Sequence, residues 1–342
     1  MSYSRIVSMS DHFALTTPVA FFIFNRPDAT ERVFAEIARA KPRRLLVVAD
    51  GPRSTSEAER CFAARAVIEQ VDWDCEVLTN FSEVNLGCKR RVASGLDWVF
   101  DHCDEAIILE DDCLPHPTLF RYCAELLEKY RGDERVMMIS GDSFLGERDT
   151  NGYSYYFGYC FHIWGWATWR RAWRHYDVDM KLWPELKETA WLSDILVRED
   201  LVNYWRNIFD KVFAGGFDTW DYQWFYTCWS QHGLAIIPNV NLVRNIGFGE
   251  MATHTRDFVS TMADIPAAEI PFPLRHPQGM LRDREADILT VTRIWPWVVE
   301  RRGLYHILRR KWFCALPIPV QRSFIFLRAK LTAQTRRHSL SS

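Results

Sequence analysis

Short apolar runs alternate with segments of helical periodicity through the first 140 residues, and this alternation most constrains the fold. The apolar runs are 18–24, 45–49, 75–78, 105–109 and 135–140. Apolar side chains recur with helical spacing between them, at 30–40, 57–70, 89–100 and 118–130. Strands that alternate with helices form parallel βαβ units. We therefore predict an α/β fold with a mostly parallel central sheet flanked by helices.

The regular alternation ends near residue 150. Segment 153–173 is aromatic and punctuated by glycine, 188–214 has helical spacing, and 234–237 is a further apolar run. We predict one domain over 17–256.

This predicted domain has two halves and is followed by two further segments. The halves are 17–145 and 146–256. Residues 257–292 are predicted to be a linker, and 293–342 a basic, aromatic C-terminal extension.

The net charge of −2 conceals a strong asymmetry. Arg293 to Ser342 contains eleven Lys or Arg residues and one acid, Glu300, so the rest of the chain carries 31 basic and 43 acidic residues. A basic aromatic tail suits an anionic membrane surface, or it packs onto the acidic body; both interpretations stay open. The acidic body argues against a nucleic-acid partner.

The cysteines and the apolar runs bear on the compartment. The nine cysteines include no C-x-x-C pair, and no apolar run approaches the roughly 20 residues of a membrane span. No apolar run with a basic flank opens the chain. We expect a cytoplasmic protein, with the tail as its contact with the inner face of the membrane if the first interpretation holds.

Polar side chains follow three of the predicted strands. Asn25 and Arg26 follow the first, Asp50 the second, and Glu110-Asp111-Asp112 the fourth. Ligands of such sheets bind beyond the carboxyl ends of the strands. Three adjacent acids repel one another unless a cation lies among them, and Mg²⁺ or Mn²⁺ with a phosphate satisfies this need. The alternative is a solvated acidic turn.

A second candidate phosphate site opens the helix at 89–100. Asn85, Gly87 and Lys89 precede or begin it, and a helix N-terminus with basic residues suits a pyrophosphate. Helix surfaces also carry such charges without a ligand. Asp50 could accept a hydrogen bond from a base, or be a structural Asp-Gly turn. The fingerprints G-x-G-x-x-G, Walker A and G-x-S-x-G are absent.

Six stretches carry a resemblance to a known class. They are Phe24–Arg26, Ala49–Gly51, Leu109–Pro115, Trp164–Trp169, Thr219–Trp224 and Asn241–Gly247. On these stretches the chain resembles the GT-A class of nucleotide-sugar glycosyltransferases, and within it the bacterial hemolytic-protein-like family, a relative of family 2 enzymes. It is also similar to N-acetylglucosaminyltransferase I, which has a Glu-Asp-Asp form of the DxD motif.

The resemblance implies that the half 17–145 binds the nucleotide and the half 146–256 the acceptor, and it implies roles in donor binding. Asn25 and Arg26 would lie near the nucleotide, and Asp50 would read the base, most plausibly uracil. Glu110 and Asp111 would contact ribose, pyrophosphate or the donor sugar.

The resemblance also implies the metal ligand and the base. Asp112 would bind Mn²⁺ or Mg²⁺, and Asp221 would be the catalytic base. The chain has Trp-Asp-Tyr where the animal enzyme's family has Trp-Asp-Asp, so Asp218 is the second candidate.

Residues outside these motifs complete the expected site. His254 would complete the metal or pyrophosphate site or be a hydrogen-bonded loop residue, since neutral imidazole binds Mn²⁺ well. Gly247 and Gly249 would let this loop approach phosphate. Ten of the fifteen tryptophans lie between Trp164 and Trp229. We expect Trp164, Trp166 and Trp220 to bind the acceptor sugar, with core packing as the alternative.

These expectations describe a metal-dependent, inverting glycosyltransferase that moves a sugar from a UDP-sugar to a hydroxyl of a glycan or lipid-linked acceptor. A nucleotidyltransferase is the second enzyme class, but it would be expected to have a Gly-rich basic loop after the first strand. A non-catalytic carbohydrate- or membrane-binding protein leaves the acids without a role.

Overall fold

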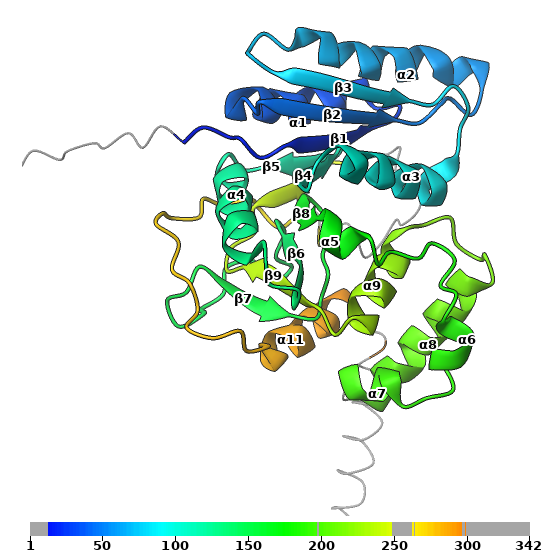
Figure 1. The fold of residues 1–342 in the computed structure, drawn as a ribbon, viewed down its shortest axis with the longest axis vertical. Coiled ribbons are helices and arrows are strands. Elements are labelled where there is room, and N and C mark those ends of the chain that lie inside the picture. The colour runs from blue at the N-terminus through cyan, green and yellow to red at the C-terminus, as the bar shows by residue number, and fades with distance from the viewer. Residues whose placement is uncertain (1–12, 197, 248–261, 263, 296–297, 299–342) are drawn as a thin grey trace, which may run out of the picture.

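The computed structural model describes residues 13–196, 198–247, 262, 264–295 and 298, and its ribbon is shown in Figure 1. The predicted α/β fold with a mostly parallel sheet is confirmed. The predicted strands are present as β1 (Val19–Ile23), β2 (Arg44–Ala49), β3 (Glu76–Phe81), β4 (Glu105–Glu110), β6 (Val136–Ser140) and β9 (Leu234–Pro238).

The helices between these strands are also present. They are α1 (Pro27–Ala40), α2 (Thr55–Ala66) with the 3₁₀ turn η1 (Val67–Gln70), α3 (Gly87–His102) and α4 (Thr118–Tyr130). Pro27 stands in the first turn of α1, where its fixed φ is favourable, and the left-handed Lys41 ends the helix before Pro42.

The second half contains elements that the periodicity does not reveal. They are β5 (Cys113–Pro115), β7 (Tyr155–Gly158), β8 (Trp166–Trp169), β10 (Val243–Asn245), α5 (Arg170–Trp173), α6 (Trp183–Leu186), α7 (Trp191–Ile195), α8 (Glu199–Phe213), α9 (Asp221–Ser230) and α11 (Arg284–Ile294). The helical segment predicted at 188–214 is divided into α7 and α8.

Among the described residues, eight strands form the main sheet in the order β3-β2-β1-β4-β8-β6-β9-β7. Strands β8 and β7 are antiparallel to their neighbours, and the other six run parallel. Because β8 separates β4 from β6, Ile108 and Ser140 both pair with Trp166. The carboxyl ends of β1, β2, β4 and β6 therefore meet at one edge.

Two apolar clusters cover the two faces of this sheet. Alternate residues of β1 point to opposite faces, as Phe22 packs in one cluster and Phe21 in the other. Helices α3, α5, α8, α9 and α11 cover the first face, and α1 and α4 cover the second. The site at the strand ends thus lies on a rigid three-layer scaffold.

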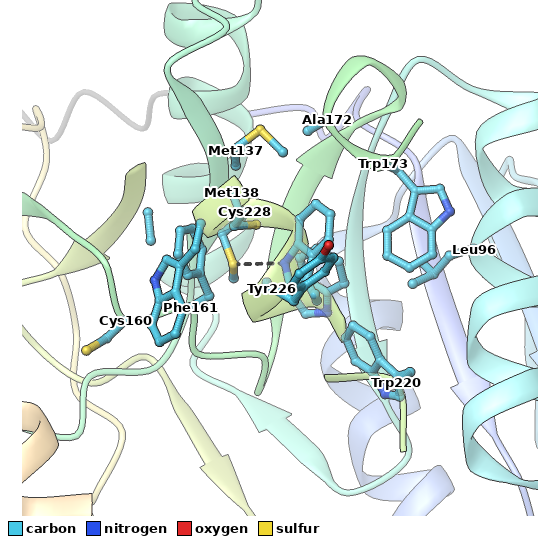
Figure 2. Packing of buried hydrophobic residues seen from close by; sticks show 14 of the residues in the cluster. Leu96, Met137, Met138, Cys160, Phe161, Ala172, Trp173, Trp220, Tyr226 and Cys228 are labelled. Atoms are coloured by element: carbon cyan, nitrogen blue, oxygen red, sulfur yellow. Dashed lines mark hydrogen bonds between the residues drawn. The ribbon is translucent and has the colours of Figure 1, made fainter. Parts of the chain in front are cut away.

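Most of the tryptophan excess packs the first face. Trp166 stacks on Trp220 with ring centroids 5.6 Å apart, and Trp224 lies at the same distance from Trp166. The Trp224 indole donates to Met138 Sδ at 3.3 Å, and Figure 2 shows this core around α9.

The predicted linker packs against the domain over its described part. Ile270 and Leu274 are buried in the second cluster, while Ala286 and Val291 of α11 are buried in the first. The side chain of Asp283 caps α11 by accepting from the Ala286 amide at 2.9 Å. The segment supplies apolar side chains to both faces, so it differs from the free linker that its Pro-rich start suggests. None of the helices in the described ranges is long and apolar enough to cross a membrane.

Candidate active site

The acid triplet closes β4 beside the end of β1, and Arg26 lies among its carboxylates. Arg26 pairs with Asp111 and with Asp112, each at 2.6 Å. Asp111 is 2% exposed and also accepts a hydrogen bond from the Phe24 amide at 3.0 Å. The parallel pairing of β1 with β4 brings Arg26 to these acids, although Asp111 lies 85 positions after Arg26 in the chain.

The triplet carries more negative charge than Arg26 neutralises. Burial, and then the charge of Asp112, raise the pKa of Glu110 to about 8. Burial raises the pKa of Asp111 to about 6 even though Arg26 acts in the opposite direction. Burial lowers the pKa of Arg26, but Asp111 and Asp112 outweigh it and raise the value above normal. A site of this kind attracts further positive charge.

Gly247 brings a second loop onto the triplet. Strand β10 pairs antiparallel with β5, which places Asn245 opposite Cys113, and the Ile246 amide donates to the Asp112 carbonyl at 2.8 Å. A Cβ on Gly247 would lie 2.3 Å from Asp112 Oδ2 and 2.6 Å from Arg26 Nη1. A side chain at this position would displace Asp112 or Arg26, so this loop closely approaches one side of the acid cluster.

Asp50 is held by the start of α3. It is 8% exposed and accepts from the amides of Gly51, Leu86 and Gly87 and from the Asn85 side chain, at 2.9–3.2 Å. These bonds occupy both carboxylate oxygens. Asp50 and Asn85 thus both fix the loop before α3, and their expected roles in nucleotide binding stay predictions.

Asp218 caps the same helix from a distant loop. Its carboxylate accepts from the amides of Cys88 at 3.1 Å and Lys89 at 2.9 Å. The amides of residues 86–89 are thus all bonded to Asp50 or Asp218. These two carboxylates lie where the sequence predicts a pyrophosphate. The Lys89 side chain is half-buried, and its expected role in donor binding stays a prediction.

Asp221 begins α9 three residues after Asp218. The Thr219 hydroxyl donates a hydrogen bond to its carboxylate. Burial raises the pKa of Asp221, and its charge in turn contributes to the raised pKa of Glu110. Asp221 is only partly exposed, and it is close enough to the triplet for the two charges to interact. The structure thus gathers Arg26, Glu110, Asp111, Asp112 and Asp221.

Other expected residues lie elsewhere. Asn25 donates its side-chain amide to Glu57 at the start of α2. Trp166 and Trp220 are at most 2% exposed, so they are core residues and form no sugar platform on this surface. Trp164 is partly exposed and lies edge-on to Phe144 at 5.0 Å. His254 and Gly249 lie outside the described residues.

Asp142 is a buried acid that the sequence analysis does not single out. It follows β6, so the strand-end rule that identifies the triplet also points to it. Its Oδ1 accepts from Ser140 Oγ at 3.0 Å, while Oδ2 has no partner among the described residues. Burial raises the pKa of Asp142 to about 8. A protonated carboxyl at this position would add no negative charge to the strand ends.

The donor set fits a metal that is shared with a ligand. Over the described ranges, no group of three or more His, Cys, Asp or Glu side chains could hold a metal ion alone. Mg²⁺ needs only one or two carboxylates when phosphate oxygens and water complete its shell. Asp112 and Glu110 meet that smaller requirement, and the excess buried negative charge favours a cation.

Comparisons with known proteins identify no family for this chain. No family model and no curated protein matches the chain. One similar solved structure is a UDP-glucose pyrophosphorylase complexed with UDP-glucose, at a TM-score of 0.25 and 12% sequence identity. The match covers 42% of this chain and 62% of that chain, which is less than two-thirds of its length. A similarity of this size indicates nothing about the activity of the present chain.

Proposed function

We propose that this protein is a metal-dependent, inverting glycosyltransferase that uses a nucleotide-diphospho-sugar, with UDP as the favoured nucleotide. One observation carries the proposal. The triplet Glu110-Asp111-Asp112, in which Asp111 is buried and its two neighbours are partly exposed, is only partly neutralised by Arg26 and interacts with a second carboxylate, Asp221, on a separate element. One acid group suits the metal and diphosphate, and the other suits proton removal from an acceptor hydroxyl.

The donor side is assigned to the triplet. Asp112, with Glu110, would hold Mn²⁺ or Mg²⁺ together with oxygens of the donor diphosphate. The bound cation would neutralise the charge that gathers on the leaving nucleoside diphosphate. Asp111 is fixed by the Phe24 amide and in turn orients Arg26, which would add positive charge on the same side.

The acceptor side is assigned to Asp221. An acceptor hydroxyl needs a base within hydrogen-bond reach as it attacks the anomeric carbon. A carboxylate whose pKa is raised by burial is a stronger base than an ordinary aspartate, and the Thr219 hydroxyl orients it. Attack on the face opposite the leaving group inverts the anomeric configuration. Asp218 is engaged by α3, which favours Asp221 as the base.

The acceptor is proposed to be a glycan or a lipid-linked sugar, and no nucleic acid is expected to bind. The basic tail is proposed to contact an anionic membrane surface on its cytoplasmic side. Partly exposed Trp164 and Lys89 are the remaining candidates for acceptor and donor contacts.

The test is the release of UDP from UDP-sugars by the full-length chain. UDP-glucose, UDP-galactose and UDP-N-acetylglucosamine are each incubated with Mn²⁺, and we expect slow hydrolysis of at least one. Asp112→Asn should lower this rate at least a hundredfold and remove its metal dependence. Asp221→Asn should lower it at least tenfold, while Asp72→Asn, on an exposed loop, should leave it unchanged.

The pH profile adds a second readout. Because burial raises the pKa of Asp221, the rate should rise with pH across a range above that of an ordinary aspartate. The proposal fails if the protein instead releases pyrophosphate from UTP and a sugar 1-phosphate, because that is the nucleotidyltransferase reaction. It also fails if no UDP-sugar is hydrolysed and UDP does not raise the melting temperature.

A further inference from the structure

A polar groove lies at the end of the sheet opposite the acid triplet, and the proposed reaction gives it no role. Its volume is about 500 Å³, within the range of about 300–1,000 Å³ that is typical of sites for small ligands. Residues of segment 13–18, which leads into β1, form one wall. One face of α4 forms the other wall, through Arg121, Ala124, Glu125 and Glu128 at helical spacing.

The groove is separate from the candidate active site. Glu105 lines the groove and begins β4, whereas Glu110 ends the same strand. At about 3.3 Å per residue, these two glutamates are about 17 Å apart along the strand. Pro18 also lines the groove and directly precedes β1, whose other end leads to Arg26. A ligand in the groove therefore does not occupy the place proposed for the donor diphosphate.

Both signs of charge line the groove, and an ion-pair network orients part of them. Arg131 follows α4 and donates to the two oxygens of Glu105, at 3.0 and 2.9 Å. It also pairs with Glu128 at 2.7 Å. The Glu105 side chain is only 14% exposed. Its carboxylate is therefore oriented before a ligand binds, which lowers the entropy cost of binding.

A chain of hydrogen-bonding groups holds the remaining glutamate of the groove. Glu125 Oε1 lies 3.4 Å from His276 Nε2, and His276 Nδ1 lies 3.0 Å from the Tyr155 hydroxyl. The Tyr155 hydroxyl in turn bonds to that of Tyr130 at 2.6 Å. The Glu125 side chain is 33% exposed and lines the groove. Its carboxylate is thus held by the protein and still accessible to a ligand.

The lining favours a neutral molecule with several hydroxyl groups. The three glutamates would repel an anion, and Arg121 and Arg131 would weaken the attraction for a cation. A hydroxyl donates to a carboxylate and accepts from a guanidinium, so a polyol satisfies both kinds of group. Phe13 also lines the groove and is 43% exposed, so its ring offers an apolar surface to the C–H face of a sugar.

We infer that this groove is a second saccharide site, which binds a neutral mono- or disaccharide unit of a glycan. In a protein that acts on glycans, such a site would keep a long chain bound between reactions. That role rests on the proposed function, whereas saccharide binding in the groove does not.

The test is saturation-transfer difference NMR with the full-length chain, without nucleotide or metal. Maltose, cellobiose, lactose and N,N′-diacetylchitobiose are added in turn, and at least one should bind with a millimolar or lower Kd. Glu125→Gln should weaken this binding about tenfold, because a neutral acceptor replaces a charged one. Phe13→Ser should weaken it at least fivefold. Glu59→Gln and Phe62→Ser are the matched controls, because both residues are exposed on α2.

Further measurements separate this groove from other sites and other ligands. Asp221→Asn should bind the saccharide as the parent does, and binding should be equal at low and high salt because the ligand is neutral. The inference is overturned if none of the four saccharides binds, or if spermidine binds in their place. It is also overturned if Asp221→Asn abolishes binding, or if Glu125→Gln and Phe13→Ser, with melting temperatures that match the parent's, bind as their controls do. Because UDP release is measured separately, failure of one proposal is distinguishable from failure of the other.

Discussion

Gly247 controls the shape of the acid cluster at the scale of single residues. The Cβ of Gly247→Ala would overlap Asp112 Oδ2 and Arg26 Nη1. We expect this substitution to separate the Arg26–Asp112 ion pair and to lower metal-dependent UDP release at least tenfold. The free energy of unfolding should fall by no more than about 1–2 kcal/mol, because the clash involves side chains at a partly exposed site.

A matched substitution controls for the added methyl group. A Cβ on Gly132 meets no atom within 4 Å, so Gly132→Ala should leave both activity and stability nearly unchanged. Equal activity of Gly247→Ala and Gly132→Ala would show that the Arg26–Asp112 pair does not matter to the reaction.

His162 is expected to make the free energy of unfolding depend on pH. It is 4% exposed, packs edge-on against Phe144 at 4.5 Å, and burial lowers its pKa to about 3. The unfolded chain takes up the proton near pH 6.5, while the folded chain does not. The contribution of neutral His162 is therefore complete above pH 6.5 and is lost as the pH falls toward 3, by up to about 1.4 kcal/mol per unit.

The measurement is urea unfolding of His162→Phe at pH 7 and pH 5. The variant should lose less stability between these values than the parent does. His102→Phe, at the exposed end of α3, should keep the parent's pH dependence. Parallel losses in the parent and in His162→Phe would refute the assignment.

At the scale of elements, two remote carboxylates hold the start of α3. Leu86 is the N-cap residue and makes no side-chain cap, so the helix depends on Asp50 at the end of β2 and on Asp218 before α9. The second contact joins residues 130 positions apart. It fixes the beginning of α9, and therefore Asp221, against the helix that borders the acid triplet.

Asp218→Ala should show both consequences of that contact. Loss of a helix cap typically costs about 1 kcal/mol, which urea unfolding measures. UDP release should fall several-fold as well, because Asp221 loses its support, and Asp218→Asn should recover part of both through its amide oxygen. Asp28→Ala, an exposed acid in the first turn of α1, is the control. Loss of stability with full activity would limit Asp218 to a structural role.

The periodic elements could be predicted from sequence, and the contacts between distant elements could not. Runs such as 45–49 are buried on both faces and flanked by helices, so local pattern identifies them. Strand β8 begins at Trp166 in a Gly- and Trp-rich stretch whose apolar content has no period of two, and the short pair β10–β5 forms only by tertiary contact.

The candidate site also contains residues that the sequence identifies and contacts that it does not. The triplet was identifiable because strand ends collect ligands, whereas the bonds of Asp50 and Asp218 to α3 depend on where loops meet in space. The tryptophan excess was the least informative feature, because a sequence does not distinguish a tryptophan in the core from one that binds a sugar. Trp166 and Trp220 are in the core.

At the scale of the whole molecule, several large apolar side chains are exposed around α11, at one end of the described structure. Leu281, Ile288 and Leu289 are 83%, 46% and 44% exposed around α11, and the +10 segment follows this helix directly. An anionic bilayer would attract the basic segment, which would orient the candidate site relative to a lipid-linked acceptor.

This orientation predicts salt-sensitive binding to vesicles of phosphatidylcholine with 30% phosphatidylserine, measured by co-sedimentation. Each basic residue near such a surface contributes about 1 kcal/mol, so replacing Arg309, Arg310 and Lys311 together by Gln should weaken binding roughly a hundredfold at low salt. The same change in net charge at the exposed Arg32, Lys41 and Arg43 should have little effect, because α1 lies away from the membrane-facing end. If both triple variants lose binding equally, net charge rather than the tail attracts the protein. If neither does, the tail packs on the acidic body.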